Sequence, residues 1–434
     1  MNSRLLIHRR PSEKSYIIPA ELIGNPVRSV TDWPDTLVKQ EVVPLWCALV
    51  FSCMNRCLSV MIDYLIIGAG ISGAAAAYEL APHGTVVLLE AEASAAYHST
   101  GRSAALYTPN YGSDLVRRIN RLSHGFLSRP PEGFCTQPLL SPRGMLCVAS
   151  TGQESQLATL VAEGGEEVEH LDAEQTLSLA PFLRQERVIG AAFEKAVADM
   201  DVDALHQGFL KGMRQRGGEL FLNSRVIGLQ RCGDSWKVEL QDRQIDARCI
   251  VNAAGAWADD VARLAGIQPM GLEPRRRTAI LVEPPAGLCL AGVPAMDFIG
   301  VDNYIKPDAG QLMVSPGDET PVAAHDVQPD DMDVAVLVDW LENETQLEVK
   351  RLAHQWAGLR SFVADGAPVA GFDPEAQDFF WLAGQGGYGI MMASALARAS
   401  ASLITGGVLP QDFIEAGVTE SELSVTRLRV AAGA

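Results

Sequence analysis

The chain has 434 residues, of which 47% are apolar and 20% charged, a composition typical of a globular α/β protein with more than one domain. Its formal net charge of −18 argues against nonspecific nucleic-acid binding, which requires Lys and Arg to replace phosphate counterions. The eight cysteines include no CxxC pair, which favours reduced thiols in a cytoplasmic protein over a metal site.

The first sixty residues differ from the rest because they show no sustained hydrophobic period. The apolar stretch 43–54 is shorter than the roughly 20 residues that a membrane-spanning helix needs. Met61 stands just before the first convincing strand. We therefore expect residues 1–60 to be a disordered extension or a mis-assigned start, with Met61 or Met54 as the native start. A short arm that contacts a membrane is the alternative.

The first strong pattern is a strand, a glycine-rich turn and a helix. Residues 64–67 form an apolar run typical of a buried parallel strand, and an Ala-rich helix is predicted over residues 72–80. Between them lies a GxGxxG motif, in which Gly68 permits a tight turn and Gly70 lets backbone approach a pyrophosphate. Gly73 lets the helix pack closely on the strand.

A second predicted strand, residues 85–89, ends in Glu90, twenty residues after Gly70. A carboxylate at this position can accept hydrogen bonds from both ribose hydroxyls and disfavours the 2′-phosphate of NADP. A glycine-rich turn without a ligand is the alternative, but the ordered strand, turn, helix, strand and acid argue against it. NAD or FAD is therefore predicted.

Three further segments contain small residues where backbone can approach a cofactor. Residues 248–266 read as an apolar strand that runs into AAGAW, although ordinary close packing would explain this pattern as well. Residues 379–407 read as a strand, a GQGGYG turn and a long Ala-rich helix, whose N-terminus suits a group that becomes electron-rich, such as reduced flavin. The third segment is HSTGRSAALYTPNYG, residues 98–112.

Together these motifs resemble the D-amino-acid oxidase superfamily of FAD enzymes, which includes glycine and sarcosine oxidases, over residues 61–425. Within it the sequence is most similar to bacterial D-arginine dehydrogenase and related D-amino-acid dehydrogenases. YHSTGRSAALYTPNYG, VNAAGAWADD, YIKPDAGQLMVSP, HQWAGLRSFVADGAPVAG and GQGGYGI carry the resemblance. It implies non-covalent FAD and an α/β fold, in which a Rossmann-type FAD-binding domain is interleaved with an α+β substrate domain. An antiparallel sheet of the substrate domain would cover the flavin.

The resemblance also implies discontinuous domains. The FAD-binding domain is expected at residues 61–112, 198–270 and 352–426, the substrate domain at 113–197 and 271–351, and a tail at 427–434. From the hydrophobic pattern we predict strands at 226–227, 236–240 and 245–250 and helices at 153–163 and 332–345.

The residues that the resemblance assigns to FAD lie in the glycine motif, at the acid after the second strand and in the later small-residue segments. They are Gly68, Gly70, Ser72, Gly73, Glu90, Ala91, Ser99, Thr100, Gly101, Arg102, Ser103, Ala104, Ala105, Leu106, Val226, Ala254, Gly255, Gly386, Gly387, Tyr388, Gly389 and Ile390. The Val at position 226 would contact adenine through its backbone.

The resemblance also assigns substrate contacts. Arg360 would bind the substrate α-carboxylate bidentately, unless it is a structural Arg at a strand end. The Tyr304 hydroxyl would reach the same carboxylate, unless the ring is simply packed in a sheet. Arg277 would line the pocket, although three consecutive arginines could be a solvated charge run with the register shifted by one. Tyr111 would act as a lid, and backbone at Gly387 would lie near the amine. No residue is assigned acid–base catalysis, and no metal is expected.

Three positions depart from the D-arginine enzymes. Leu106 replaces a His, Gly144 and Met145 stand where an acid would meet the guanidinium, and Met391 replaces a Gln. A cationic substrate side chain would then lack a partner, so neutral or apolar D-amino acids are predicted to be preferred. Lys306, two residues after Tyr304, is interpreted as a bulge or a solvated strand end without a role.

The function predicted from the resemblance is oxidative deamination of D-amino acids by hydride transfer from Cα to flavin N5, giving a 2-oxo acid and ammonia. The alternatives are an O2-using oxidase of the glycine or sarcosine type, an NAD-linked dehydrogenase, and a flavoprotein without turnover. The expected partners are the small substrate and an electron acceptor, with a quinone as one candidate. Neither nucleic acid nor a membrane-spanning segment is expected. The expected location is cytoplasmic, and peripheral contact with the inner membrane is the alternative.

Overall fold

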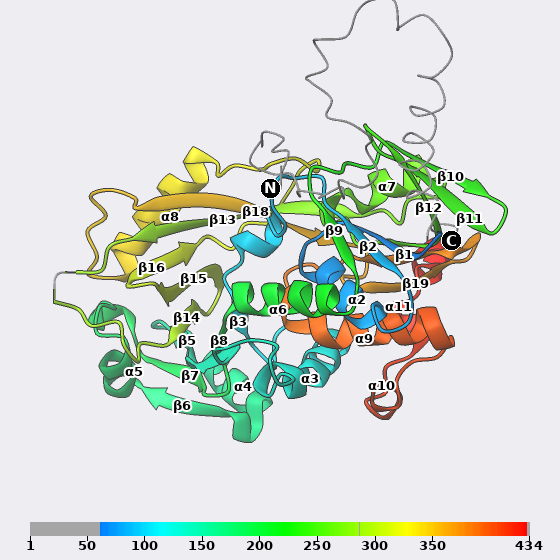
Figure 1. Ribbon diagram of the computed structural model, residues 1–434. Coiled ribbons are helices and arrows are strands. Elements are labelled where there is room, and N and C mark those ends of the chain that lie inside the picture. The colour runs from blue at the N-terminus through cyan, green and yellow to red at the C-terminus, as the bar shows by residue number, and fades with distance from the viewer. Residues whose placement is uncertain (1–60, 286, 432–434) are drawn as a thin grey trace, which may run out of the picture. The chain divides into compact units, whose positions relative to one another are not determined.

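A computed structural model describes residues 61–285 and 287–431, so the predictions for residues 1–60 concern a part of the chain that it does not describe. Two large sheets organise the described residues, and Figure 1 shows them side by side within one compact unit. Among these residues, no helix combines the length and the apolar character needed to cross a membrane.

The first sheet has eight strands and is parallel at its centre. Strand β1 (Ile62–Ile67) pairs in parallel with β2 (Val86–Leu89) on one side and with β12 (Gln244–Asn252) on the other. The remaining strands are β9 (Glu219–Phe221) and β20 (Ala376–Ala383), which are parallel to their neighbours β2 and β12, and the antiparallel β10 (Gly228–Cys232), β11 (Ser235–Glu239) and β19 (Val369–Asp373). The central strands are continuous apolar runs, as expected for strands of a sheet that is covered on both faces.

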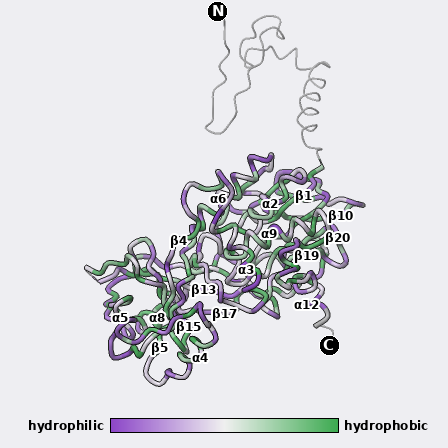
Figure 2. Tube along the Cα trace, turned by 90° about the horizontal axis from the view of Figure 1, so that it is seen from below, coloured by the Kyte–Doolittle hydropathy of each residue, from purple (hydrophilic) through white to green (hydrophobic). Residues whose placement is uncertain are grey.

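Four helices, of which α2 and α9 are Ala-rich, form a layer on one face of this sheet. The helices of this layer are α2 (Ile71–Leu80), α3 (Asp114–Ser128), α6 (Val202–Gln215) and α9 (Gly389–Gly406). Small side chains let α2 and α9 pack closely, and most residues of both helices are buried. The opposite face buries Trp236, Phe379 and Trp381 together with α7 (Ala258–Leu264). Figure 2 shows the predominantly apolar colouring along β1 and β20.

The second sheet has nine strands. In spatial order they are β17 (Thr320–Pro321), β13 (Glu273–Val282), β16 (Gln311–Ser315), β15 (Val301–Asp308), β14 (Ala295–Phe298), β5 (Met145–Ala149), β7 (Gly190–Glu194) and β6 (Val168–Asp172), with β18 (His354–Phe362) paired to β13. All pairs are antiparallel except β14 with β5, which is parallel, so the predicted antiparallel sheet is in fact mixed.

Shorter elements complete the described chain. A three-stranded sheet joins β3 (Leu106–Tyr107), β8 (Ala198–Met200) and β4 (Leu140–Pro142). The remaining α-helices are α4 (Glu154–Gly164), α5 (Ala173–Leu179), α8 (Asp331–Glu344), α10 (Gln411–Glu415), α11 (Glu420–Leu423) and α12 (Thr426–Ala431).

The α/β fold predicted from the sequence is confirmed, with one wrong strand. Val226 and Ile227 lie outside any strand, because pairing between β10 and β11 begins at Gly228 opposite Glu239. The domain boundaries stay a prediction. Strand β18 lies in the segment assigned to the FAD-binding domain, yet it pairs with β13 in the second sheet.

Candidate active site

A cavity of about 1270 Å³ is lined by strands of the second sheet and by loops and helix N-termini that follow strands of the first sheet. Its wall combines the N-termini of α2 and α9, the loop of residues 99–111, and strands β13, β15 and β18. This volume exceeds the roughly 300–1,000 Å³ of ordinary small-molecule pockets. It therefore suits a large cofactor together with a small substrate.

The turn between β1 and α2 accepts only glycine at two positions. Gly68 has φ +101°, and a Cβ there would lie 2.5 Å from the Ala253 carbonyl oxygen. A Cβ on Gly73 would lie 1.9 Å from the Gly68 oxygen. The N-terminus of α2 has no side-chain cap, and Gly70 and Ser72 line the cavity there. The Ile71 N–H is hydrogen-bonded to the Thr100 hydroxyl, and the other N–H groups at the start of α2, beside a close backbone approach, fit the diphosphate of FAD.

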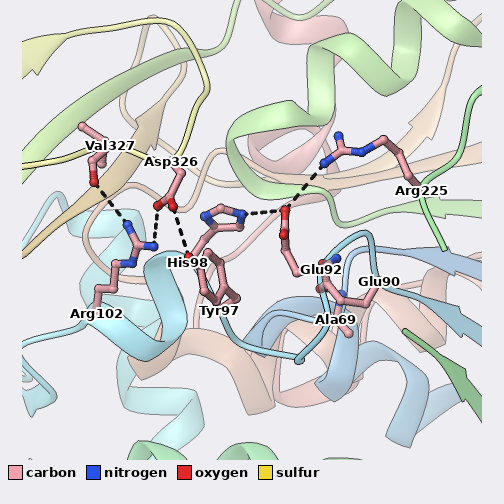
Figure 3. Close-up of polar contacts among 9 residues, drawn as sticks. All are labelled: Ala69, Glu90, Glu92, Tyr97, His98, Arg102, Arg225, Asp326 and Val327. Atoms are coloured by element: carbon pink, nitrogen blue, oxygen red, sulfur yellow. Dashed lines mark hydrogen bonds and ion pairs between the residues drawn. The ribbon is translucent and has the colours of Figure 1, made fainter. Parts of the chain in front are cut away.

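Glu90 directly follows β2 and is held by backbone donors. Its two carboxylate oxygens accept hydrogen bonds from Ala69 N and Glu92 N, each at 3.0 Å. Glu92 in turn contacts His98 at 3.3 Å and Arg225 at 3.5 Å, as Figure 3 shows. These contacts fix the Glu90 carboxylate next to the start of α2, where the ribose of FAD is predicted to bind.

Residues 99–106, which we call the flavin loop, are hydrogen-bonded to the second sheet and to helix α2. The Ser99 hydroxyl donates to the Leu359 carbonyl of β18 at 2.6 Å. The Thr100 hydroxyl oxygen accepts a hydrogen bond from Ile71 N at 3.0 Å, at the first turn of α2. The loop therefore links the second sheet to the predicted diphosphate site.

Arg102 is engaged by protein partners. Its guanidinium donates to Asp326 at 2.6 Å, to the Val327 carbonyl at 3.3 Å and to the Ala357 carbonyl at 3.0 Å. The Tyr97 hydroxyl donates to the same Asp326 at 3.1 Å, as Figure 3 shows. The side chain thus anchors the flavin loop, and the Arg102 carbonyl accepts a hydrogen bond from Trp356 Nε1 at 3.1 Å, so a contact of Arg102 with FAD stays a prediction.

The second half of the flavin loop rests on a buried ammonium group. Ala105 adopts φ +58°, which is unusual outside glycine, and its N–H donates to the Ser103 hydroxyl at 3.0 Å. Lys306, only 4% exposed, donates to the Ala104 carbonyl at 2.8 Å and lies 3.5 Å from Asp199. The interpretation of this lysine as a bulge or a solvated strand end is therefore wrong.

Replacing Lys306 by Met is expected to lower both the midpoint of thermal unfolding and the affinity for FAD. The change leaves the Ala104 carbonyl without its donor and Asp199 with Arg143 as its remaining cation, a loss of about 1–3 kcal/mol. Differential scanning fluorimetry and flavin titration of the apoprotein measure both effects. Lys350→Met, whose side chain is 85% exposed, is the matched control. Equal values for the two variants would contradict the anchoring role.

The turn before α9 also requires glycine. Gly386 has φ +53°, and a Cβ there would lie 2.3 Å from the Phe362 ring. A Cβ on Gly387 would lie 2.9 Å from Arg360 Nη1. The helix begins after Tyr388 without a side-chain cap, so its free N–H groups fit the electron-rich edge of a reduced flavin. The cavity-lining residues of this turn and helix are Gly384, Gln385, Gly386, Gly387, Gly389, Ile390 and Met391.

Two arginines line the cavity beside this turn. Arg277 on β13 pairs with Glu319 at 3.0 Å, but its Nε is buried without a hydrogen-bond partner. Burial and the neighbouring positive charge of Arg360 lower the pKa of Arg277. Among the described residues, none forms an ion pair with Arg360. Of the three consecutive arginines, Arg277 lines the cavity, whereas Arg275 and Arg276 do not. The pair therefore carries positive charge that an anionic ligand would balance.

The other predicted substrate residues also line the cavity. Tyr304 on β15, Leu106 and Met391 are part of its wall. Tyr111 is 47% exposed, and its ring centroid lies 5.2 Å from that of Tyr388. The structure thus brings together all seven residues predicted to bind substrate, while their roles stay predictions.

Several residues predicted to contact FAD are not part of the cavity wall. They are Gly68, Gly73, Glu90, Ala91, Gly101, Val226, Ala254 and Tyr388. Gly68 and Gly73 permit the close packing of the turn between β1 and α2 and do not line the cavity. Val226 lies close to the Glu90 segment, because Ser224 N donates to the Glu90 carbonyl at 2.7 Å.

Sequence reasoning missed seven carboxylates in the cavity wall: Asp302, Asp318 and Glu319, and a group of four, Glu163, Glu167, Glu194 and Asp297. Burial raises the pKa of Glu194 to about 7, although a hydrogen bond from Asn110 opposes the shift. Burial also raises the pKa of Asp297. The sequence signal available for these residues was Asp297, an acid inside the apolar stretch PAMDFIG. Spacing could not reveal the group, because its members come from separate segments of the chain.

Comparison with known proteins identifies the family. The model of the family described as FAD dependent oxidoreductase (DAO) matches residues 63–403. A glycine oxidase of Bacillus licheniformis is 26% identical over 384 residues, which cover 84% of this chain and 99% of that protein. The mitochondrial sarcosine dehydrogenase of Homo sapiens is 24% identical, over 83% of this chain and 41% of that protein.

Solved structures agree in fold. An L-proline dehydrogenase from P. horikoshii has a TM-score of 0.71 at 21% identity, covering 86% of this chain and 99% of that one. A glycine oxidase from Geobacillus kaustophilus has a TM-score of 0.69 at 21% identity, over 79% of this chain and 94% of that one. These relatives bear out the predicted superfamily, whereas the closer likeness to D-arginine dehydrogenase stays a prediction. This chain belongs to the DAO family of FAD-dependent oxidoreductases.

Proposed function

We propose that this enzyme oxidatively deaminates D-amino acids, giving a 2-oxo acid and ammonia. The observation that carries the proposal is the pair of guanidinium groups, Arg360 and Arg277, with which Glu319 forms the single ion pair found in the part of the chain that the structure describes. They lie in the cavity wall together with Tyr304 and the glycine turn before α9. An α-carboxylate is the ligand that two adjacent guanidinium groups and a hydroxyl suit best.

The protein's part in the reaction is positioning. Arg360 and Tyr304 would hold the carboxylate, and backbone at Gly387 would lie near the α-amine. Bound FAD supplies the hydride acceptor, so the protein must place Cα–H correctly and does not need a dedicated base. Tyr111, which contacts Tyr388, would cover the substrate and exclude water.

The predicted preference for neutral or apolar side chains depended on one premise, that a cationic side chain would find no carboxylate. Leu106, Met145 and Met391 do line the cavity as apolar groups. However, Glu194 and Asp297 line it too, so the premise does not hold. The class of side chain has to be argued from these carboxylates.

A small-amine oxidoreductase is the second candidate. Relatives that cover most of this chain are named glycine oxidase and sarcosine dehydrogenase, and these names favour glycine or N-methylated glycine as substrate. Membership in an FAD family leaves the NAD-linked alternative without support.

Product analysis with purified, flavin-loaded protein tests the proposal. D-amino acids, their L-enantiomers, glycine and sarcosine are each supplied with an artificial electron acceptor, and 2-oxo acid and ammonia are measured. Turnover of D-amino acids is expected to exceed that of the L-enantiomers and glycine. Higher turnover with glycine or sarcosine would support the second candidate instead. Measuring H2O2 against reduction of a soluble quinone, in the same assay, separates an oxidase from a dehydrogenase.

Replacing Tyr304 by Phe is expected to lower kcat/KM for the preferred D-amino acid by about 10- to 100-fold. The change removes one hydrogen bond to a charged carboxylate, worth about 1.5–3 kcal/mol. Steady-state kinetics measure the change, with KM carrying most of it if the hydroxyl acts in binding. Tyr64→Phe on β1, outside the cavity wall, is the control. A KM for Tyr304→Phe equal to that of the wild type would argue against the contact.

A further inference from the structure

One face of the second sheet forms a continuous floor along the cavity. Tyr304 on β15 lies opposite Asp297 on β14, and Asp297 lies opposite Cys147 on β5. Cys147 lies opposite Ala192 on β7, and Glu194 follows on the same face, two residues further along that strand. These five residues all belong to the cavity wall. The order β15, β14, β5 and β7 can be followed in Figure 1.

Charged side chains lie on both sides of Tyr304 along this floor. Arg277 and Arg360 belong to β13 and β18, on one side of Tyr304. Asp297 lies one strand beyond Tyr304 on the other side, about 5 Å away, and Glu194 lies three strands beyond it, about 15 Å away. The end beside the predicted α-carboxylate site therefore holds Arg277 and Arg360 together with the carboxylates Asp302, Asp318 and Glu319, and the far end, which we call the anionic end, holds Asp297 and Glu194.

Two guanidinium groups, those of Arg117 and Arg121, also line the cavity, but among the described residues neither forms an ion pair with Asp297 or Glu194. Asp297 Oδ1 is buried and has no hydrogen-bond partner. Glu194 accepts a hydrogen bond from the neutral amide of Asn110, which also donates to Glu167 at 2.9 Å. Within the described ranges, no carboxylate of this end forms an ion pair, and Arg121, whose charge lowers the pKa of Glu194, donates its hydrogen bond to Asn110. A buried, unpaired carboxylate is costly to keep charged, and a cation supplied by a ligand would remove that cost.

We infer that the substrate carries a positive charge on its side chain, which Asp297 and Glu194 bind. The inference rests on the proposed function and names its substrate class: a D-amino acid with an ammonium or guanidinium group at the end of an aliphatic stem. Apolar atoms of Met145 and Leu160 line the same end of the cavity and suit such a stem.

The carboxyl groups that face one another set the pH dependence. Glu194 on β7 is surrounded by Glu167, by Asp297 on β14, by Asn110 and by Arg121 on α3. Its pKa is raised to about 7, mainly by burial, so it is neutral below this pH and charged above it. Cation binding is therefore expected to strengthen as the pH rises through neutrality.

The ratio of kcat/KM for D-arginine to that for D-citrulline isolates this interaction. Citrulline is a neutral, nearly isosteric analogue of arginine, so effects on the shared α-amine and α-carboxylate cancel in the ratio. We expect the ratio to be about 10- to 100-fold at pH 8, because a charge-assisted hydrogen bond is lost with citrulline, and to fall toward pH 6. Glu194→Gln and Asp297→Asn should each lower the ratio at pH 8 and flatten its pH dependence. Glu169→Gln, at an exposed position on the neighbouring strand β6, should leave the ratio at the wild-type value.

Failure of the inference and failure of the proposed function give different results. A ratio near one at every pH, with active turnover of D-citrulline and D-methionine, overturns the inference and leaves the function intact. A high ratio that neither Glu194→Gln nor Asp297→Asn lowers also overturns it. Reduction of the flavin by no D-amino acid at all would overturn the proposed function itself. If one variant does not fold, the other variant and the wild-type pH profile still decide.

Discussion

Replacing Arg360 by Ala is expected to lower kcat/KM for the preferred D-amino acid by about 100- to 1,000-fold. The guanidinium of Arg360 forms no ion pair among the described residues and lines the cavity beside Gly387. Deleting one partner of a buried, hydrogen-bonded charge pair costs about 2–5 kcal/mol, and the expected loss corresponds to about 2.7–4 kcal/mol, within these limits. The loss should appear chiefly in KM, since the role proposed for Arg360 is to bind the carboxylate.

The variant Arg360→Lys separates the effect of the positive charge from that of the bidentate contact. Lysine keeps the charge but cannot form the bidentate contact, so its kcat/KM should lie between the wild type and Arg360→Ala. Arg231→Ala is the control, because Arg231 pairs with Asp378 on the first sheet and does not line the cavity. All three variants should retain FAD. Wild-type kinetics in Arg360→Ala would mean that the substrate carboxylate binds elsewhere.

Replacing Gly73 by Ala is expected to yield protein with little or no bound FAD and a markedly lower unfolding midpoint. A Cβ at this position would lie 1.9 Å from the Gly68 carbonyl oxygen, a backbone atom that cannot move aside. The first turn of α2 would have to shift away from β1, together with the N–H groups proposed to hold the diphosphate. The ratio of flavin to protein absorbance and scanning fluorimetry measure both effects.

Gly125→Ala provides the matched helical control. Gly125 lies inside α3, where an added Cβ would meet no atom within 4 Å. Because alanine is the better helix former by about 1 kcal/mol, this variant should be as stable as the wild type or more so, and yellow. Full flavin content in Gly73→Ala would contradict the close packing of the turn.

The cofactor end was predictable because it depends on residues that are close in sequence. The glycine motif, the strands on either side of α2 and the acid at Glu90 lie within about thirty residues, where spacing alone specifies strand, turn and helix. The long helix after the glycine turn was predictable for the same reason. The Val226 strand failed because two β-branched residues cannot specify pairing, which is decided by the partner strand β11.

The far end of the cavity was not predictable from spacing. Glu194 and Asp297 are about a hundred residues apart in sequence and meet only because β14 pairs with β5, which pairs with β7. Lys306 illustrates the same limit. Alternation placed it on the face of Tyr304, but only the tertiary fold buries its ammonium group against the Ala104 carbonyl. The predicted side-chain preference depended on three positions that differ from the D-arginine enzymes. In the folded chain, carboxylates from other positions, Glu194 and Asp297, line the cavity.

Anaerobic mixing of the flavin-loaded protein with an amino acid tests the central claim most directly. If the cavity holds a D-amino acid with Cα–H toward the flavin, D-arginine or D-methionine should bleach the oxidised flavin band without any other reductant. The L-enantiomers should bleach it far more slowly, and Arg360→Ala should require a much higher concentration of the D-amino acid. If the flavin stays oxidised with every D-amino acid and is bleached only by dithionite, the enzyme does not oxidise D-amino acids.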